Sequence, residues 1–228
     1  MVTSIRIPAA VAAMRVNRSL TAAVEKRILV WMAERAPHWL TPDHLTSLGF
    51  GAQIAAGACF ALSSFNRLAL LGTVFCITLN WLGDSLDGTL ARVRNQQRPR
   101  FGFYVDHMVD IFGSVALMVG LACSRLVHSQ IAIAMLVAFI VLASESFLAT
   151  NSLSMFEMSQ GFFGPTEIRI LLIAGTLAAL RSPFSVIAGH RFLLFDVGGI
   201  IATIAMLATA IVKTARHTAQ LYREEPIP

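Results

Sequence analysis

The segment from Asp84 to Asp110 reads DSLDGTLARVRNQQRPRFGFYVDHMVD. It lies at the junction of two long apolar runs, at about 68–91 and 101–125. Each run is long enough to cross the ~30 Å hydrocarbon core of a bilayer as a helix. Because the loop over 93–100 is short, we expect the two helices to be antiparallel neighbours. The segment therefore predicts a membrane-spanning helical hairpin.

The rest of the chain continues this pattern of apolar blocks. Of the 228 residues, 56% are hydrophobic and only 14% are charged, whereas a soluble domain averages about 45–50% apolar and about 25% charged residues. This composition excludes a disordered chain, a secreted disulfide scaffold and a nucleic-acid-binding domain. It predicts an all-α, polytopic membrane protein with about six transmembrane helices, at 45–64, 68–91, 101–125, 131–153, 166–181 and 193–213. The fifth of these segments is short for a span.

The distribution of Lys and Arg predicts the orientation in the membrane. With a cytoplasmic N-terminus, 14 of the 18 basic residues fall on the cytoplasmic side and 4 on the other. This is a clear positive-inside pattern, so both termini should be cytoplasmic. The net charge of +5 is then explained by topology and by anionic membrane lipids, and no nucleic-acid partner is expected.

The first 42 residues form a separate cytoplasmic segment, before a transmembrane domain over 43–228. Within 19–36 an apolar stripe recurs at helical spacing, and the charged residues Glu25, Lys26, Glu34 and Arg35 lie mostly off it. The stripe consists of Leu20, Val24, Ile28 and Trp31. It predicts an amphipathic helix in the headgroup plane, anchored by Trp31 and ended by Pro37. Residues 1–24 carry three Arg and no acid, which fits a basic cytoplasmic flank or a transit peptide.

Four of the six aspartates lie within the quoted segment of 27 residues. On the first helix, one face carries Asp84, Asp87, Gly88 and Ala91 at positions i, i+3, i+4 and i+7. On the second, one face carries Gly102, Asp106 and Asp110 at i, i+4 and i+8. Ionisable residues at membrane depth are costly and indicate a functional site. The hairpin should bring these two faces together.

Four converging carboxylates need compensating positive charge. Oxygen ligands alone favour hard divalent cations such as Mg²⁺ or Mn²⁺, and a pair of such ions is a common clamp for displacement at phosphorus. The small side chains at Gly88 and Ala91 leave space for a substrate, and Arg92 is placed to bind a phosphate. The spacing thus predicts metal-dependent phosphoryl transfer or pyrophosphate cleavage at the membrane boundary.

These residues resemble the motif of the CDP-alcohol phosphatidyltransferase family. The family pattern is D-x-x-D-G-x-x-A-R, about eight residues, then G-x-x-x-D-x-x-x-D, and all eight fixed positions are present here. The connecting gap is nine residues, near the long end of the usual range. A second, weaker similarity is Pro42-Asp43-His44-Leu45-Thr46, which resembles the P-[ND]-x-x-T that opens the first span in this family.

The resemblance implies a reaction and a set of roles. The donor would be a CDP-linked lipid, most often CDP-diacylglycerol, and the acceptor a small or lipid-headgroup alcohol. Three aspartates (Asp84, Asp87 and Asp106) would hold two Mg²⁺ or Mn²⁺ ions, with Asp110 completing the site and acting as general base. Substrate would contact Gly88, Ala91, Arg92 and Thr46. The family also implies a homodimer in a bacterial plasma or inner membrane, with a cytoplasmic active site in phospholipid synthesis.

Two other functions are compatible with carboxylates in a membrane. A UbiA-type prenyltransferase also uses aspartate-rich motifs and Mg²⁺, and Asn80 with Asp84 gives an N-x-x-x-D fragment, but that family needs more spans. A carboxylate-based ion transporter is the third possibility. The roles of Arg98, Glu145, Glu167 and Arg169 stay open at this stage. Glu145 belongs either to an acceptor pocket or to interhelical hydrogen bonding, and Thr166 is predicted to cap the fifth span.

Overall fold

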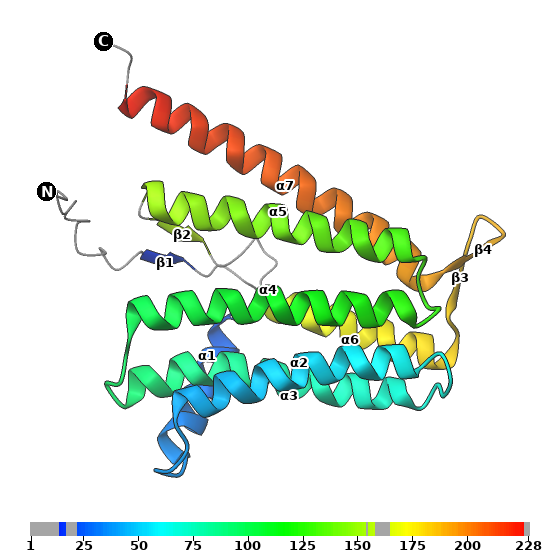
Figure 1. Ribbon diagram of the computed structural model, residues 1–228, viewed down its shortest axis with the longest axis horizontal. Helices are drawn as coiled ribbons and strands as arrows, with labels where there is room; N and C mark the ends of the chain where they lie inside the picture. Colours follow the sequence, from blue (N-terminus) through cyan, green and yellow to red (C-terminus); the bar gives the residue numbers. More distant parts are fainter. Residues whose placement is uncertain (1–13, 17–21, 154, 158–164, 226–228) are drawn as a thin grey trace, which may run out of the picture.

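The structure, a computed structural model, describes residues 14–16, 22–153, 155–157 and 165–225. Seven helices make up most of this part of the chain (Figure 1). They are α1 (Ala22–Arg35), α2 (Pro42–Leu62), α3 (Ala69–Val93), α4 (Pro99–Cys123), α5 (Ser129–Leu153), α6 (Pro165–Arg181) and α7 (Leu194–Glu224). The predicted basic flank or transit peptide at 1–24 falls almost entirely outside the described residues.

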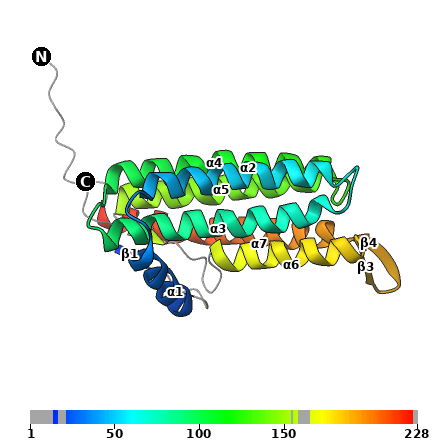
Figure 2. The ribbon, with the colours of Figure 1, turned by 90° about the horizontal axis from the view of Figure 1, so that it is seen from below.

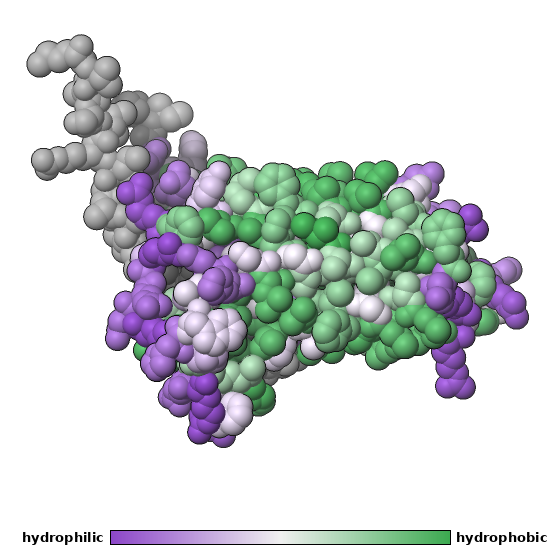
Figure 3. All heavy atoms as spheres, turned by 60° about the horizontal axis from the view of Figure 1, so that its bottom comes forward, coloured by the Kyte–Doolittle hydropathy of each residue, from purple (hydrophilic) through white to green (hydrophobic). Residues whose placement is uncertain are grey.

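Each of the six predicted spans corresponds to one helix, from α2 to α7, so the all-α membrane fold is confirmed. Five helices are long and apolar enough to cross a bilayer, namely α2, α3, α4, α5 and α7. The sixth, α6, has 17 residues, at the lower limit for a span. On the face shown in Figure 3, an apolar band lies between two polar ends of the molecule. The chain is therefore an integral membrane protein, and the number of spans stays a prediction.

Four short strands were not predicted from the sequence. The first two, β1 (Met14–Val16) and β2 (Met155–Glu157), pair in parallel, and β3 (Phe184–Ile187) and β4 (His190–Leu193) form an antiparallel hairpin before α7. The β3–β4 turn has positive φ at both central residues, Ala188 and Gly189, as a tight hairpin turn requires.

A local capping arrangement starts the first long helix. The backbone N–H of His44 donates to Thr41 Oγ1 at 3.2 Å, and the Thr41 N–H donates to His44 Nδ1 at 3.4 Å. Pro42, at the first helical turn, has no N–H to leave unsatisfied. These three residues satisfy the helix start and explain why α2 begins at Pro42.

Glycines allow α2 to approach its two neighbours closely. A side chain at Gly57 would overlap the backbone carbonyl of Ala116 on α4, and one at Gly120 would overlap the Gly57 backbone. On the other side, a Cβ at Gly83 of α3 would lie 2.7 Å from both the Gly49 nitrogen and the Leu45 carbonyl oxygen. Small residues permit such contacts between membrane helices. The α2–α3 approach lies next to Asp84 and so determines the spacing of the site.

The N-terminal helix α1 lies obliquely at the end of the bundle that carries the α3–α4 loop (Figures 1 and 2). Leu29 and Ala33 are buried in a cluster with Leu45, Leu86 and Leu90. The described part of the predicted stripe faces away from this cluster, since Val24, Ile28 and Trp31 are all exposed. Leu20 lies outside the described residues. One side of α1 thus packs on the bundle, while the predicted apolar stripe is free to contact lipid.

Candidate active site

The aspartates of the 84–110 segment meet where α2, α3 and α4 come together. They line one pocket. Each helix contributes three residues, two of which lie three or four positions from the third, so that the three share one helical face. The lining is Thr46, Gly49 and Phe50 from α2, Asn80, Asp84 and Asp87 from α3, and Asp106, Val109 and Asp110 from α4. The two aspartate faces predicted from helical spacing therefore lie in the same pocket.

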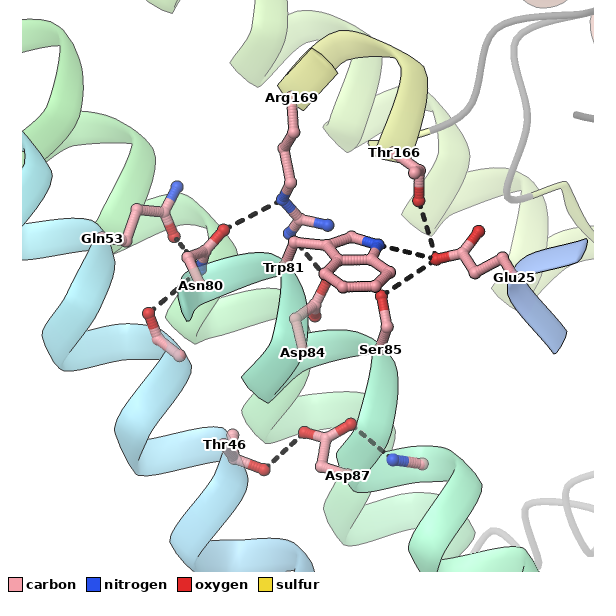
Figure 4. A network of polar contacts seen from close by, with 12 residues as sticks. Glu25, Thr46, Gln53, Asn80, Trp81, Asp84, Ser85, Asp87, Thr166 and Arg169 are labelled. Carbon is pink, nitrogen blue, oxygen red and sulfur yellow. Dashed lines mark hydrogen bonds and ion pairs between the residues drawn. The ribbon is translucent and has the colours of Figure 1, made fainter. Parts of the chain in front are cut away.

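Asp87 is buried and receives two hydrogen bonds from protein donors. Thr46 Oγ1 donates to Asp87 Oδ2 at 2.6 Å, and the backbone N–H of Gly88 donates to Asp87 Oδ1 at 2.5 Å (Figure 4). A buried carboxylate needs such donors because burial removes its hydration. The hydroxyl of Thr46 on α2 thereby fixes the position of a motif aspartate on α3.

Asp84 forms an ion pair with a residue from a distant part of the chain. Arg169 Nη2 lies 2.6 Å from Asp84 Oδ2, and Arg169 Nε donates to Asn80 Oδ1 at 2.9 Å (Figure 4). Asn80 Nδ2 in turn donates to the Gly49 carbonyl at 3.0 Å. The Arg169 side chain is only 15% exposed. Residues from α6, α3 and α2 are therefore joined around Asp84.

The three other predicted substrate contacts on α3 lie beyond the pocket lining. Gly88 and Ala91 are half-buried and Arg92 is exposed. Arg92 Nη2 donates to Thr89 Oγ1 at 2.9 Å, and its guanidinium lies beside Gly88, where a Cβ would be 3.4 Å from Nη1. These residues follow Asp87 along α3 toward the α3–α4 loop. Their roles in substrate binding stay predictions.

Two arginines of the α3–α4 loop have structural contacts that the sequence did not indicate. Arg94 donates to the backbone carbonyls of Leu40 and Ala36, at 2.5 and 2.9 Å. Arg98 pairs with Asp43 at the start of α2. These contacts tie the loop to the α1–α2 connection and to α2.

Two further polar residues differ from their predicted surroundings. Thr166 was predicted to cap the fifth span, but α6 begins at Pro165, and the Thr166 hydroxyl donates to Glu25 Oε1 at 2.8 Å. Glu145 on α5 pairs with His217 on α7 at 2.6 Å. Of the two alternatives for Glu145, the structure therefore supports the interhelical contact, and Glu145 is not part of the pocket lining.

The donor set of the pocket fits divalent metal ions. Its four carboxylates supply only oxygen ligands, which hard cations such as Mg²⁺ and Mn²⁺ prefer. Within the described part of the chain, no group of three or more His, Cys, Asp or Glu side chains is arranged to hold a metal ion. Two of the aspartates contact protein donors, since Asp84 faces Arg169 and Asp87 faces Thr46 and the Gly88 N–H. These donors contact the same carboxylates that the motif assigns to the metal ions.

Several lining residues were not among the predicted site residues. Asn80 lies four positions before Asp84, on the same helical face, so its spacing was a usable signal. Gly49 and Phe50 lie three and four positions after Thr46, on the same face of α2. Val109 lies three positions after Asp106, on the same face of α4. Glu25 had no such signal, because its partners lie on α3 and α6, far away in the sequence.

The chain matches a known protein family, and its fold has a counterpart among solved structures. The family model described as CDP-alcohol phosphatidyltransferase matches residues 39–214. A solved structure of phosphatidylinositol phosphate synthase from Mycobacterium tuberculosis, with CDP-DAG bound, aligns with a TM-score of 0.61 and 22% sequence identity. The alignment covers 86% of this chain and 94% of that one. No curated protein sequence matches significantly. The structural similarity extends across nearly the whole fold, at an identity that shows the fold alone.

Proposed function

The chain belongs to the CDP-alcohol phosphatidyltransferase family, and on that premise we propose that it transfers the phosphatidyl group of CDP-diacylglycerol to a second alcohol. The family makes the protein a transferase of phospholipid synthesis that acts on a CDP-alcohol. With the family established, the prenyltransferase and transporter alternatives fall away. What remains to be assigned is the donor lipid, the acceptor and the role of each residue.

One observation carries the assignment of the site. Four aspartates from two helices line a single pocket, and all four belong to the motif that resembles the family pattern. The similar solved structure contains CDP-DAG, which supports the same donor here. In this proposal the pyrophosphate of the donor would lie beside the carboxylates.

The carboxylates have two tasks in this proposal. Asp84, Asp87 and Asp106 would hold two divalent ions, with Asp110 completing the set. When bound, Mg²⁺ or Mn²⁺ supplies positive charge across the pyrophosphate. Thr46 keeps Asp87 in place through its 2.6 Å hydrogen bond. Gly88, Ala91 and Arg92 would contact the CDP moiety near the loop end of α3.

Asp110 is the proposed general base. Its carboxylate accepts the proton of the acceptor hydroxyl, and the hydroxyl oxygen forms a bond to the phosphorus that carries diacylglycerol. The bond from that phosphorus to the CMP oxygen breaks, and CMP leaves with the electron pair. The proton remains on Asp110 until it is lost to water. The products are a phosphatidyl alcohol and CMP.

Several features support a cytoplasmic active site. Strand β1 and the C-terminal end of α7 lie at the same end of the bundle as the α3–α4 loop (Figure 1). The sequence assigns 14 of 18 basic residues to that side, as the positive-inside rule expects. A water-soluble acceptor would then reach the pocket from the cytoplasm, while the acyl chains of the donor stay in the bilayer. A homodimer in a bacterial plasma membrane is part of the same proposal.

The test is release of CMP by purified protein. We would supply CDP-diacylglycerol, Mg²⁺ or Mn²⁺ and a panel of alcohols that includes glycerol 3-phosphate, inositol phosphate, serine and choline. Release with one alcohol, and loss of that release with EDTA, is the expected result and identifies the acceptor. Failure to release CMP with every alcohol and with other CDP-linked donors would contradict the proposed reaction.

A further inference from the structure

A single carboxylate oxygen on α1 accepts three hydrogen bonds near the pocket. Glu25 Oε1 receives Trp81 Nε1 at 2.9 Å, Ser85 Oγ at 3.1 Å and Thr166 Oγ1 at 2.8 Å (Figure 4). Trp81 and Ser85 belong to α3, whereas Thr166 belongs to the first turn of α6. Three helices therefore meet at one oxygen atom, and Glu25 is half-buried among them.

The donors to Glu25 flank the Asp84–Arg169 pair on both helices. On α3, Trp81 lies three residues before Asp84, and Ser85 directly follows Asp84. On α6, Thr166 lies three residues before Arg169, so both side chains are on the same side of the helix. Figure 4 shows the contacts of Glu25 and those of Asp84 side by side.

The first turn of α6 carries the contact to Glu25. The first turn of a helix has backbone N–H groups without intrahelical partners, and helix ends fray readily. In α6 this turn carries Thr166, and the next turn carries Arg169, whose guanidinium reaches Asp84 and Asn80. A shift of the first turn away from α3 would move Arg169 with it.

We propose that Glu25 is a positioning residue, which fixes the first turn of α6 against α3 and thereby holds Arg169 on Asp84. Glu25 does not touch the pocket lining and acts through Thr166, Trp81 and Ser85. The effect on catalysis rests on the proposed function, whereas the effect on the Asp84–Arg169 pair does not. The interfacial helix α1 thus contributes to the geometry of a pocket built by other helices.

Substitutions at Glu25 test the effect on catalysis. Glu25→Ala removes the acceptor oxygen, and Glu25→Gln keeps an amide oxygen with two lone pairs as a hydrogen-bond acceptor. The matched control is Glu34→Ala, because Glu34 is an exposed glutamate on the same helix that pairs with Arg35. We expect kcat/KM for CMP release to fall about tenfold in Glu25→Ala, since small displacements at a reacting site cost up to about 10²-fold. Glu25→Gln and Glu34→Ala should stay close to wild type.

Trp81 provides a readout of the contact itself. The chain has three tryptophans, so Trp31→Phe with Trp39→Phe leaves Trp81 as the single emitter. The wavelength of its emission maximum should shift in Glu25→Ala and stay at the wild-type value in Glu25→Gln. If the emission shifts while kcat/KM keeps its wild-type value, the positioning role is wrong. Equal losses of kcat/KM in Glu25→Gln and Glu25→Ala would also overturn it, because hydrogen-bond acceptance would then be irrelevant.

A double-mutant cycle tests the link to Arg169 without any enzyme assay. Arg169→Met is made in the wild type and in Glu25→Ala, and the Tm of each protein is measured in detergent. If Glu25 holds Arg169 on Asp84, the two substitutions lower Tm by less than the sum of their separate effects. Additive effects overturn the proposal. A wild type that releases no CMP contradicts the proposed function and leaves this cycle unchanged.

Thr166 offers a milder variant in case Glu25→Ala does not fold. Thr166→Val removes one of the three donors and keeps the side-chain shape, while Thr166→Ser restores the hydroxyl. In the same cycle with Arg169→Met, Thr166→Val should couple and Thr166→Ser should behave like the wild type. If Thr166→Val and Arg169→Met have additive effects on Tm, and no other variant couples to Arg169→Met, then Glu25 is not a positioning residue.

Discussion

The guanidinium of Arg169 lies 2.6 Å from the carboxylate of Asp84, although the two residues are 85 positions apart. Arg169 comes from the short helix α6, and Asp84 comes from the motif on α3. The pair brings a positive charge to a pocket lined by four aspartates. Because like charges in one pocket repel each other, this cation offsets part of the negative charge that the motif concentrates there.

Replacement of Asp110 should abolish transfer. Asp110→Asn removes the proposed proton acceptor and keeps the side-chain size, and loss of a general base costs typically about 10²–10⁴-fold in rate. CMP release with the best acceptor measures the effect. The matched control is Asp196→Asn, whose carboxylate pairs with His128 at the start of α7, away from the pocket. CMP release that continues at the wild-type rate in Asp110→Asn would rule out the general base.

Divalent ions should stabilise the protein as well as activate it. A ligand at 100 times its Kd adds about 2.7 kcal/mol to the free energy of unfolding, so Mg²⁺ or Mn²⁺ should raise Tm and EDTA should reverse the rise. Asp87→Asn should weaken this shift, because it removes one of the proposed ligands. The measurement is thermal unfolding in detergent, with and without the ion. An identical shift in Asp87→Asn and in the wild type would argue against Asp87 as a ligand.

The hydroxyl of Thr46 should matter more than its size. It donates to Asp87 at 2.6 Å, and hydrogen bonds to charged groups contribute about 1.5–3 kcal/mol. Thr46→Val should therefore lower kcat/KM by about tenfold or more, and Thr46→Ser should recover most of it. Steady-state CMP release decides the question. Similar activities for the valine and serine variants would show that the Asp87 contact is dispensable.

A side chain at Gly83 should disturb both the fold and the pocket. The new Cβ of Gly83→Ala would lie 2.7 Å from backbone atoms of α2, and overpacking typically costs about 1–3 kcal/mol. We expect a lower Tm together with lower CMP release, because α2 and α3 both line the pocket. Gly51→Ala is the control, since nothing lies within 4 Å of a Cβ there. Equal Tm values for the two variants would show that α2 and α3 can move apart without loss of stability.

Much of the fold could be predicted because its signals are local. Apolar blocks placed all six long segments from α2 to α7, and Pro42 indicated where the chain enters the first of them. The spacing of Asp84, Asp87, Asp106 and Asp110 placed all four on helix faces that share one pocket. The short strands escaped prediction, since three- and four-residue strands carry too few residues for a periodic pattern.

The site was predicted less completely than the fold. Asn80 had a helical-spacing signal, but Glu25 was described only as lying off the apolar stripe of its helix, and Thr166 was predicted to be a helix cap. Both residues instead meet at one hydrogen bond between α1 and α6. The sequence offers no measure of how two helices cross, so a polar residue that faces another helix looks like one that faces water.

The amino-acid sequence by itself determined the membrane character, the helical segments and the motif aspartates, because hydropathy and the 3.6-residue period act within one helix. Only the tertiary structure decided that Thr46 meets Asp87, that Arg169 meets Asp84 and that Glu25 joins α1 to α3 and α6. Those contacts depend on the distance and angle between helices. Close backbone contacts at glycines such as Gly83 set this distance and angle. Such contacts form only when distant parts of the chain pack together.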